Sequence, residues 1–293
     1  MKKLLTATVL ASAVSALSAF SVPAFAQSAP AAEAAPASPH ELSANLALVS
    51  SYRFRGIDQT FGRPALQGGF DYAHESGFYA GNWNSNVSSG AGFPDGNLEM
   101  DLYGGWKKTW GDFGLDLGAI LYYYPGSQGR GLGLGADSGA VTNKEVYVGA
   151  SWQFLSLKYS HSVDDYFSLR GWDATGASTG KSTRGTHYLE LAASYDLGDG
   201  WGIDAHVGRL SAKHMKNGSY TDWKIGVSKD VNGWLVGLAY VDTNAKGSCS
   251  GSGSFQPYCF AKSLQDDAGA LDASSSTKDA GRGIAVLSVS RSF

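Results

Sequence analysis

The sequence predicts an all-β protein, an antiparallel up-and-down transmembrane β-barrel of about twelve strands with short periplasmic turns and long extracellular loops. Three observations support this prediction. Apolar and polar residues alternate along most of the chain, as they do in a strand with one buried face. Long and short connections follow one another strictly between the alternating stretches. Aromatic residues gather beside the short connections, where a membrane barrel has an interfacial girdle.

The first residues have the three parts of a secretory signal peptide. A basic start precedes a largely apolar stretch at residues 4–20, and a small-x-small pattern predicts cleavage after Ala26. A single membrane anchor is the alternative, but the apolar run is short and interrupted by serines. We therefore expect residues 1–26 to be removed, residues 27–41 to form a flexible Ala/Pro-rich periplasmic tether, and residues 42–293 to form the barrel.

Twelve stretches alternate with a period of two residues, which is the period of a strand. The expected strands are 43–55, 65–73, 78–87, 97–107, 113–123, 145–154, 156–162, 187–197, 201–209, 221–229, 234–242 and 283–293.

Each expected strand has an apolar face that would meet lipid. In chain order, representative residues of that face are Leu48, Phe70, Trp83, Leu102, Leu117, Val148, Leu157, Leu191, Ile203, Ile225, Leu238 and Leu287. The opposite face is polar in all but the eleventh strand, which is apolar on both faces. This pattern predicts a polar interior and an apolar exterior.

The connections differ in length in a regular order. Long ones cover residues 56–64, 88–96, 125–142, 163–185, 211–220 and 243–282, whereas short ones cover 74–77, 108–112, 198–200 and 230–233 and the region of Leu155. Two of the short ones contain Asp-Gly and Asn-Gly pairs, which tolerate the positive φ of tight hairpin turns.

The expected aromatic girdle lies at the short-turn end. It consists of Tyr79, Trp106, Trp110, Phe113, Trp152, Phe154, Trp201, Trp234 and Phe293. A soluble β-sandwich is the alternative fold, and it too would bury one face of each strand. It would require neither the asymmetry of the loops nor a row of rings at one end, so we favour the barrel.

The polar faces supply candidate pore-lining residues. These are Arg53, Arg55, Asp71, Asn82, Asn84, Asn86, Glu99, Asp101, Asp116, Glu145, Lys158, Glu190, Asp204, His206, Asp222 and Lys224. So many charges cannot lie unpaired in a dry core, so we expect a water-filled lumen.

The stretch "SSYRFRGIDQT" begins the list of candidates. Read as the end of the first strand, it directs Tyr52 and Phe54 to lipid and Arg53 and Arg55 into the lumen. We expect both arginines to pair there with Asp71, Glu99 and Asp101 on neighbouring strands and to set the charge and width of a constriction. The alternative is that such ion pairs only hold the shape of the barrel.

Other residue types exclude several classes of function. Cys249 and Cys259 are expected to form a disulfide in an exported protein, with a pair of free thiols as the alternative. Two cysteines do not supply the four ligands of a structural zinc site, so no metal and no cofactor are expected. A net charge of −3 argues against a nucleic-acid partner.

The chain resembles the TorF-type porin family of proteobacterial outer-membrane proteins. The resemblance lies in "SSYRFRGIDQT", "ALQGGFDYAHESGFYAGNW" and "WQFLSLKYSHS", and it extends over about residues 42–293. The ending "GIAVLSVSRSF" is similar to the terminal signal of outer-membrane barrels, although Arg291 stands where an aromatic residue is more usual. The resemblance implies a porin-like barrel and supplies no catalytic residues.

These observations lead to an expected function. We expect no enzyme but an outer-membrane, porin-like channel of a Gram-negative bacterium, through which small hydrophilic solutes diffuse with mild cation preference. Its expected partners are outer-membrane lipid and lipopolysaccharide, and the barrel-assembly machinery through Phe293. Two alternatives stay open: a lipid-modifying outer-membrane enzyme, for which no GxSxG elbow is present, and a plugged barrel with a structural or adhesive role.

Overall fold

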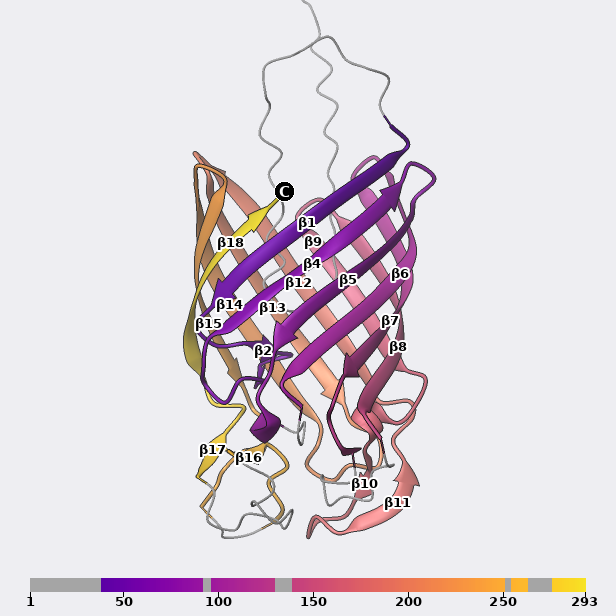
Figure 1. The fold of residues 1–293 in the computed structure, drawn as a ribbon, viewed down its shortest axis with the longest axis vertical. Coiled ribbons are helices and arrows are strands. Elements are labelled where there is room, and N and C mark those ends of the chain that lie inside the picture. The colour runs from indigo at the N-terminus through magenta and orange to yellow at the C-terminus, as the bar shows by residue number, and fades with distance from the viewer. Residues whose placement is uncertain (1–37, 92–95, 130–138, 251–253, 263–275) are drawn as a thin grey trace, which may run out of the picture.

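The computed structural model describes residues 38–91, 96–129, 139–250, 254–262 and 276–293. Within these residues, twelve strands close into one antiparallel barrel (Figure 1). The barrel strands are β1 (His40–Val49), β4 (Ala65–His74), β5 (Phe78–Asn86), β6 (Leu98–Trp110), β7 (Phe113–Tyr124), β8 (Val141–Trp152), β9 (Leu155–Ser162), β12 (His187–Gly198), β13 (Trp201–Ser211), β14 (Tyr220–Val231), β15 (Trp234–Thr243) and β18 (Ile284–Ser292). Because β1 pairs with both β4 and β18, the sheet has no free edge. The predicted all-β barrel is confirmed.

The long connections gather at one end of the barrel and carry short elements of their own (Figure 1). These elements are the hairpins β2 (Arg53–Phe54) with β3 (Ile57–Asp58), β10 (Arg170–Trp172) with β11 (Ser178–Ser182), and β16 (Cys259–Ala261) with β17 (Thr277–Asp279), and the 3-10 turns η1 (Ser89–Ala91) and η3 (Tyr166–Ser168). None of the described residues forms a helix long and apolar enough to cross a membrane. The C-terminus and the start of β1 lie at the opposite end, beside the short turns.

The short turns have the predicted hairpin geometry. Asp199 and Gly200 have φ values of 52° and 76°, and Asn232 and Gly233 have φ values of 56° and 81°. Two successive residues with positive φ match the right-handed twist of the flanking strands. These turns therefore fix the register between β12 and β13 and between β14 and β15.

The outer face of the barrel carries large apolar side chains on every strand. Large exposed side chains on successive strands include Leu48, Phe70, Phe78, Leu102, Leu117, Val148, Leu157, Leu191, Val207, Ile225, Leu238 and Leu287. At the short-turn end, the exposed rings include Trp110, Phe113, Trp152, Phe154, Trp201, Trp234 and Phe293. Soluble monomers rarely expose apolar surface of this extent.

The boundaries of the first strand differ from the prediction. β1 begins at His40, inside the segment expected to be a tether, and the expected signal peptide lies outside the described residues. β1 ends at Val49 rather than at Arg55. The chain cannot continue as a strand through residue 55, because Arg55 and Gly56 have φ values of 48° and 79° and turn the chain back on itself.

Candidate functional site

Residues 51–60, which we call the plug, lie inside the barrel between β1 and β4. Every residue of the plug is buried. β2 and β3 form its hairpin, with Arg53 opposite Asp58 and Phe54 opposite Ile57. In Figure 1 this hairpin lies within the barrel, toward the end with the long connections.

The tip of the plug reaches barrel strands that do not flank it in the chain. A Cβ atom added to Gly56 would collide with Cγ2 of Thr243 and would lie 2.8 Å from Cβ of Asp222. These residues belong to β15 and β14, whereas the plug leaves the barrel wall at β1 and rejoins it at β4. In the order of the barrel, β15 and β14 are two and three strands from β1, so the plug extends into the lumen and away from its own strands.

Arg55 at the tip of the plug forms a bidentate ion pair with Glu145 on β8. Its Nη1 and Nη2 atoms lie 3.0 and 2.7 Å from Oε1 and Oε2 of Glu145. The guanidinium group also lies over the rings of Phe54 and Tyr188, with its carbon 4.8 and 4.4 Å from the two centroids. Burial lowers the pKa of Arg55, but the charge and hydrogen bond of Glu145 together with Tyr166 and Tyr122 outweigh this effect and raise the pKa well above its usual value, so the guanidinium stays charged.

Arg53 fastens the base of the plug to the last long connection. Its Nη1 donates to the carbonyl of Ala280 over 2.9 Å, and its Nη2 lies 3.6 Å from Oδ2 of Asp58. Asp58 in turn accepts a hydrogen bond from Nζ of Lys278 over 2.8 Å. The ion pairs of the two arginines are thus with Asp58 and Glu145, and the expected pairing with Asp71, Glu99 and Asp101 is wrong.

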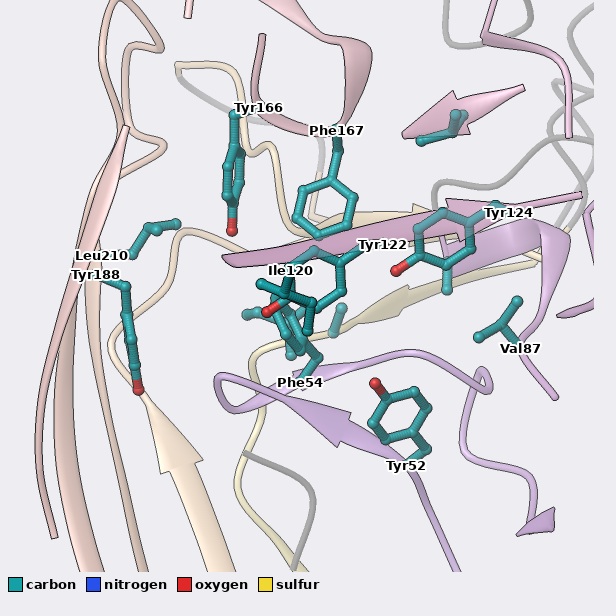
Figure 2. Packing of buried hydrophobic residues seen from close by; sticks show 14 of the residues in the cluster. Tyr52, Phe54, Val87, Ile120, Tyr122, Tyr124, Tyr166, Phe167, Tyr188 and Leu210 are labelled. Carbon is teal, nitrogen blue, oxygen red and sulfur yellow. The ribbon is translucent and has the colours of Figure 1, made fainter. Parts of the chain in front are cut away.

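Aromatic rings pack around the plug (Figure 2). Tyr52 contacts Trp83 edge-on with centroids 5.5 Å apart, and Phe54 contacts Tyr122 and Phe167 in the same manner at 5.4 and 5.8 Å. Phe167 belongs to η3, so a second long connection also folds inward. Tyr52 and Phe54 therefore do not face lipid, and that expectation is wrong.

The plug and the wall together fill the barrel at this level. Each barrel strand contributes an inward side chain that is buried here, namely Val49, Gln67, Ser85, Glu99, Tyr122, Glu145, Ser160, Tyr188, Leu210, Asp222, Val241 and Val286. The side chains of the described residues thus leave little exposed surface in this layer of the lumen.

Toward the short turns, the lumen changes to a partly exposed, charged compartment that we call the vestibule. We define it by Asp71, Asp116, Lys158, Glu190, Asp204 and Lys224. Hydroxyl groups of Tyr103 and Tyr79 donate to Asp71 and Asp116 over 2.5 and 2.7 Å, and Nζ of Lys224 lies 2.6 Å from Asp204. Each of these charges is partly exposed, and several of them have a partner among the described residues; the water-filled lumen stays a prediction.

Most predicted lumenal residues on the strands point inward. This holds for Asp71, Glu99, Asp101, Asp116, Glu145, Lys158, Glu190, Asp204, His206, Asp222 and Lys224, whose neighbours on the same strands are the exposed apolar residues. Whether they line a conducting pore stays a prediction.

β5 has the opposite orientation from the one predicted. Asn82 lies beside the exposed residues Phe70 and Leu102 of the neighbouring strands, so Asn82, Asn84 and Asn86 are on the outer face. Their amides are bonded locally: Nδ2 of Asn84 donates to Oδ1 of Asn82 over 2.6 Å.

Two rings of β5, Trp83 and Tyr79, point into the lumen instead, whereas Phe78 is exposed on the outer face. Trp83 packs on Tyr52 of the plug, and Tyr79, predicted for the girdle, donates to Asp116. An aromatic plug needs aromatic neighbours, and this requirement decides which face of β5 is buried.

The inward tyrosines are functional candidates that sequence reasoning missed. Tyr52, Tyr122, Tyr124, Tyr188 and Tyr220 are nearly fully buried in the layer of the plug. The run Tyr122–Tyr124 was a signal, because three successive aromatic residues in a strand put rings on both faces.

The cysteines and the histidines occupy the long-loop end or the wall. Cys249 and Cys259 form a disulfide with Cα atoms 5.3 Å apart. His206 bonds Asp222 through Nε2 at 2.7 Å. In the described part of the chain, no group of three or more His, Cys, Asp or Glu side chains could hold a metal ion.

Fold and lumen together define a closed, twelve-stranded antiparallel barrel with an inward-folded plug. The family described as "Bacterial protein of unknown function (Gcw_chp)" matches residues 33–262, and the chain belongs to this family. Its resemblance to TorF-type porins stays a prediction. No curated protein matches the chain.

Several solved barrels are similar in fold. The NanC porin is 10% identical, with a TM-score of 0.46 over 86% of this chain and 99% of that one. The KdgM porin in complex with disordered oligogalacturonate is 8% identical, with a TM-score of 0.46 over 86% and 97% of the two chains. An anion-selective porin from Comamonas acidovorans is 12% identical, with a TM-score of 0.37 over 87% and 99%. Similarity at this level carries no argument about the solute or selectivity of this chain.

Proposed function

We propose that this protein is an outer-membrane channel for small hydrophilic solutes, closed in the present conformation by the plug. The observation that carries the proposal is the division of the lumen. A charged, partly exposed vestibule leads to a closed layer, and the centre of that layer is a loop segment rather than the barrel wall. A loop held by side-chain contacts can leave the lumen without breaking a strand pair.

The exterior supports a location in the outer membrane. Large exposed apolar side chains on every strand and exposed rings at the short-turn end match a barrel embedded in lipid. We place the short turns in the periplasm and the long connections outside, in contact with lipopolysaccharide. Phe293 is 66% exposed at the short-turn end, where it is accessible to the barrel-assembly machinery.

A plugged barrel with a structural or adhesive role is the second candidate. The closed layer favours it, because the described side chains that line this layer are buried. The two candidates differ in whether removal of the plug reveals a pore. The lipid-modifying enzyme is supported by no contact among the described residues.

Single-channel recording in planar bilayers tests the proposal. The test variant replaces residues 51–61 with a short Gly-Ser linker, and the control variant replaces residues 173–177, at the exposed tip between β10 and β11, with a similar linker. We expect brief or infrequent openings from the natural protein and the control, and a steady conductance from the plug variant. A plug variant that folds and does not conduct would favour the structural role. Steady conductance of equal size in all three proteins would show that the plug does not close the channel.

A further inference from the structure

Glu99 and Asp101 are two buried carboxylates on the inner face of β6. They are separated by one residue, so their side chains point to the same side of the strand, and both are 0% exposed. The hydroxyl of Tyr52 in the plug donates to Oε1 of Glu99 over 3.2 Å, and Tyr124 of β7 also bonds this carboxylate. The pair thus lies where the plug meets the wall.

Three of the four carboxylate oxygens lack a partner. Among the described residues, Oε2 of Glu99 and both Oδ atoms of Asp101 are buried and accept no hydrogen bond. No ion pair within the described part of the chain includes either residue, since Arg55 is bound by Glu145 and Arg53 lies beside Asp58. Two carboxylates buried together without a cation are costly, because each loses its hydration and repels the other.

We propose that Glu99 and Asp101, together with the hydroxyl of Tyr52, bind a hard divalent cation of the Ca²⁺ type. The donors are all oxygen atoms, and the two carboxyl groups supply negative charge when they ionise on binding, which is the chemistry that Ca²⁺ selects. Ca²⁺ takes six to eight oxygen ligands in a flexible geometry, so water or backbone carbonyls complete the shell. The cation compensates the two charges where no described Lys or Arg side chain does so.

Such a cation would join the plug to the wall. Tyr52 is part of the plug, whereas Glu99 and Asp101 are part of β6, so a shared ion holds the two together. Loss of the ion would leave mutual repulsion next to the plug and loosen it. The effect of the ion on conduction rests on the proposed function, whereas the binding of the cation by Glu99 and Asp101 does not.

Terbium luminescence provides a direct test. Tb³⁺ replaces Ca²⁺ at oxygen sites, and nearby indole and phenol rings sensitise its emission. Trp83 is the cross-strand neighbour of Asp101 and packs on Tyr52, so a bound ion has sensitisers beside it. The full chain, refolded in a nonionic detergent without lipopolysaccharide, should give a saturable signal that Ca²⁺ displaces.

Three variants locate the signal. Asp101→Asn and Glu99→Gln should each weaken binding by about tenfold or more, because even changes outside the ligand shell of a metal site cost about 10- to 100-fold. Asp116→Asn is the matched control, since it removes an inward carboxylate that already accepts a hydrogen bond from Tyr79, and its binding should equal that of the natural protein.

The thermal unfolding of the natural protein gives a second, independent measurement. A chelator should lower its midpoint, and Ca²⁺ should restore it. The chelator should not affect Asp101→Asn, which has lost one charge of the pair. Absence of a saturable terbium signal, a signal that survives both substitutions, or an unfolding midpoint that does not depend on Ca²⁺ would each overturn the site. A site that binds in a barrel that never conducts would overturn only the proposed function.

Discussion

At the scale of single residues, closure of the lumen depends on a few contacts at the tip of the plug. Gly56 approaches β14 and β15 so closely that a side chain has no room. Its neighbour Arg55 has a φ of 48°. Among residues 51–60, it is the only residue other than glycine with a positive φ. The turn therefore combines backbone strain with a strong ion pair, and each can be tested separately.

Substitution of Gly56 tests the fit of the tip. In Gly56→Ala, the new methyl group must displace Thr243 or move the plug away from β15, so we expect more frequent openings in single-channel records. Gly111→Ala is the matched control, because Gly111 also has positive φ, at 58°, and has nothing within 4 Å of an added Cβ. Both variants pay the cost of a left-handed L-residue, about 1–2 kcal/mol, but only the first should change gating. Equal records from the two variants would contradict the fit.

A double-mutant cycle tests the ion pair of Arg55 and Glu145. Both side chains are nearly fully buried, so Arg55→Met or Glu145→Gln alone leaves one charge without its partner. We expect each single change to lower the free energy of unfolding by about 3–5 kcal/mol, and the double change to cost much less than the sum. Urea titration of the barrel in lipid vesicles measures these values. Additive losses would show that the pair does not couple the plug to β8.

At the scale of elements, the strands of the barrel could be predicted and the plug could not. Alternation of apolar and polar residues identified the barrel strands, including the two strands that the turn at Asn232 and Gly233 joins. A strand in a wall between lipid and water needs one apolar face, and this requirement produces the alternation. The same reasoning extended β1 to Arg55, since "SYRFR" also alternates. The alternation in this stretch belongs to a small hairpin that is buried on both faces. The pattern of one strand alone does not show whether its apolar face contacts lipid or aromatic side chains inside the barrel.

β5 illustrates the same limit. Its asparagines look lumenal and its rings look lipid-facing when polarity alone is considered, yet the structure reverses them. The orientation is determined by a contact distant in sequence, between Trp83 and Tyr52. In the candidate site, the inward charged residues of most strands could be predicted from the two-residue period of the sequence. The ion-pair partners of the two arginines could be identified only from the three-dimensional structure.

The hairpin β16–β17 provides the prediction that belongs to this scale. It includes Cys259, which is joined to Cys249, and its far end leads to Lys278 and Ala280, which bind Asp58 of the plug. Reduction should loosen this hairpin by up to about 3 kcal/mol, the value for closing a short loop, and openings should become more frequent while the barrel stays folded.

The control for this prediction is the Cys249→Ser, Cys259→Ser variant. It should conduct like the reduced natural protein and should not respond to reductant. If reductant changes neither the openings nor the protease sensitivity of the natural protein, the hairpin does not brace the plug.

At the scale of the whole molecule, the two halves of the lumen differ in kind. The half toward the long connections is packed with rings and buried charges like a protein core, whereas the vestibule is partly exposed and carries more carboxylates than lysines. We therefore expect the vestibule to set the ion selectivity. Once the plug has moved, the electrostatic field of the vestibule charges acts on every ion that passes.

The vestibule predicts a mild preference for cations in the opened channel. It contains four carboxylates, Asp71, Asp116, Glu190 and Asp204, against Lys158, Lys224 and Lys107 beside Asp116, so its sum of charge is still negative. The reversal potential of the plug variant under a KCl gradient should indicate that K⁺ is more permeant than Cl⁻. Glu190→Gln should reduce the preference, whereas Asp164→Asn, at an exposed ion pair with Lys144 outside the vestibule, should not.

Because the Debye length shortens from about 10 Å at 0.1 M salt to about 3 Å at 1 M, the preference for cations should also fade as the salt concentration rises. Anion selectivity, or a preference that is unchanged by Glu190→Gln and by salt, would show that the field of the vestibule does not select the ion.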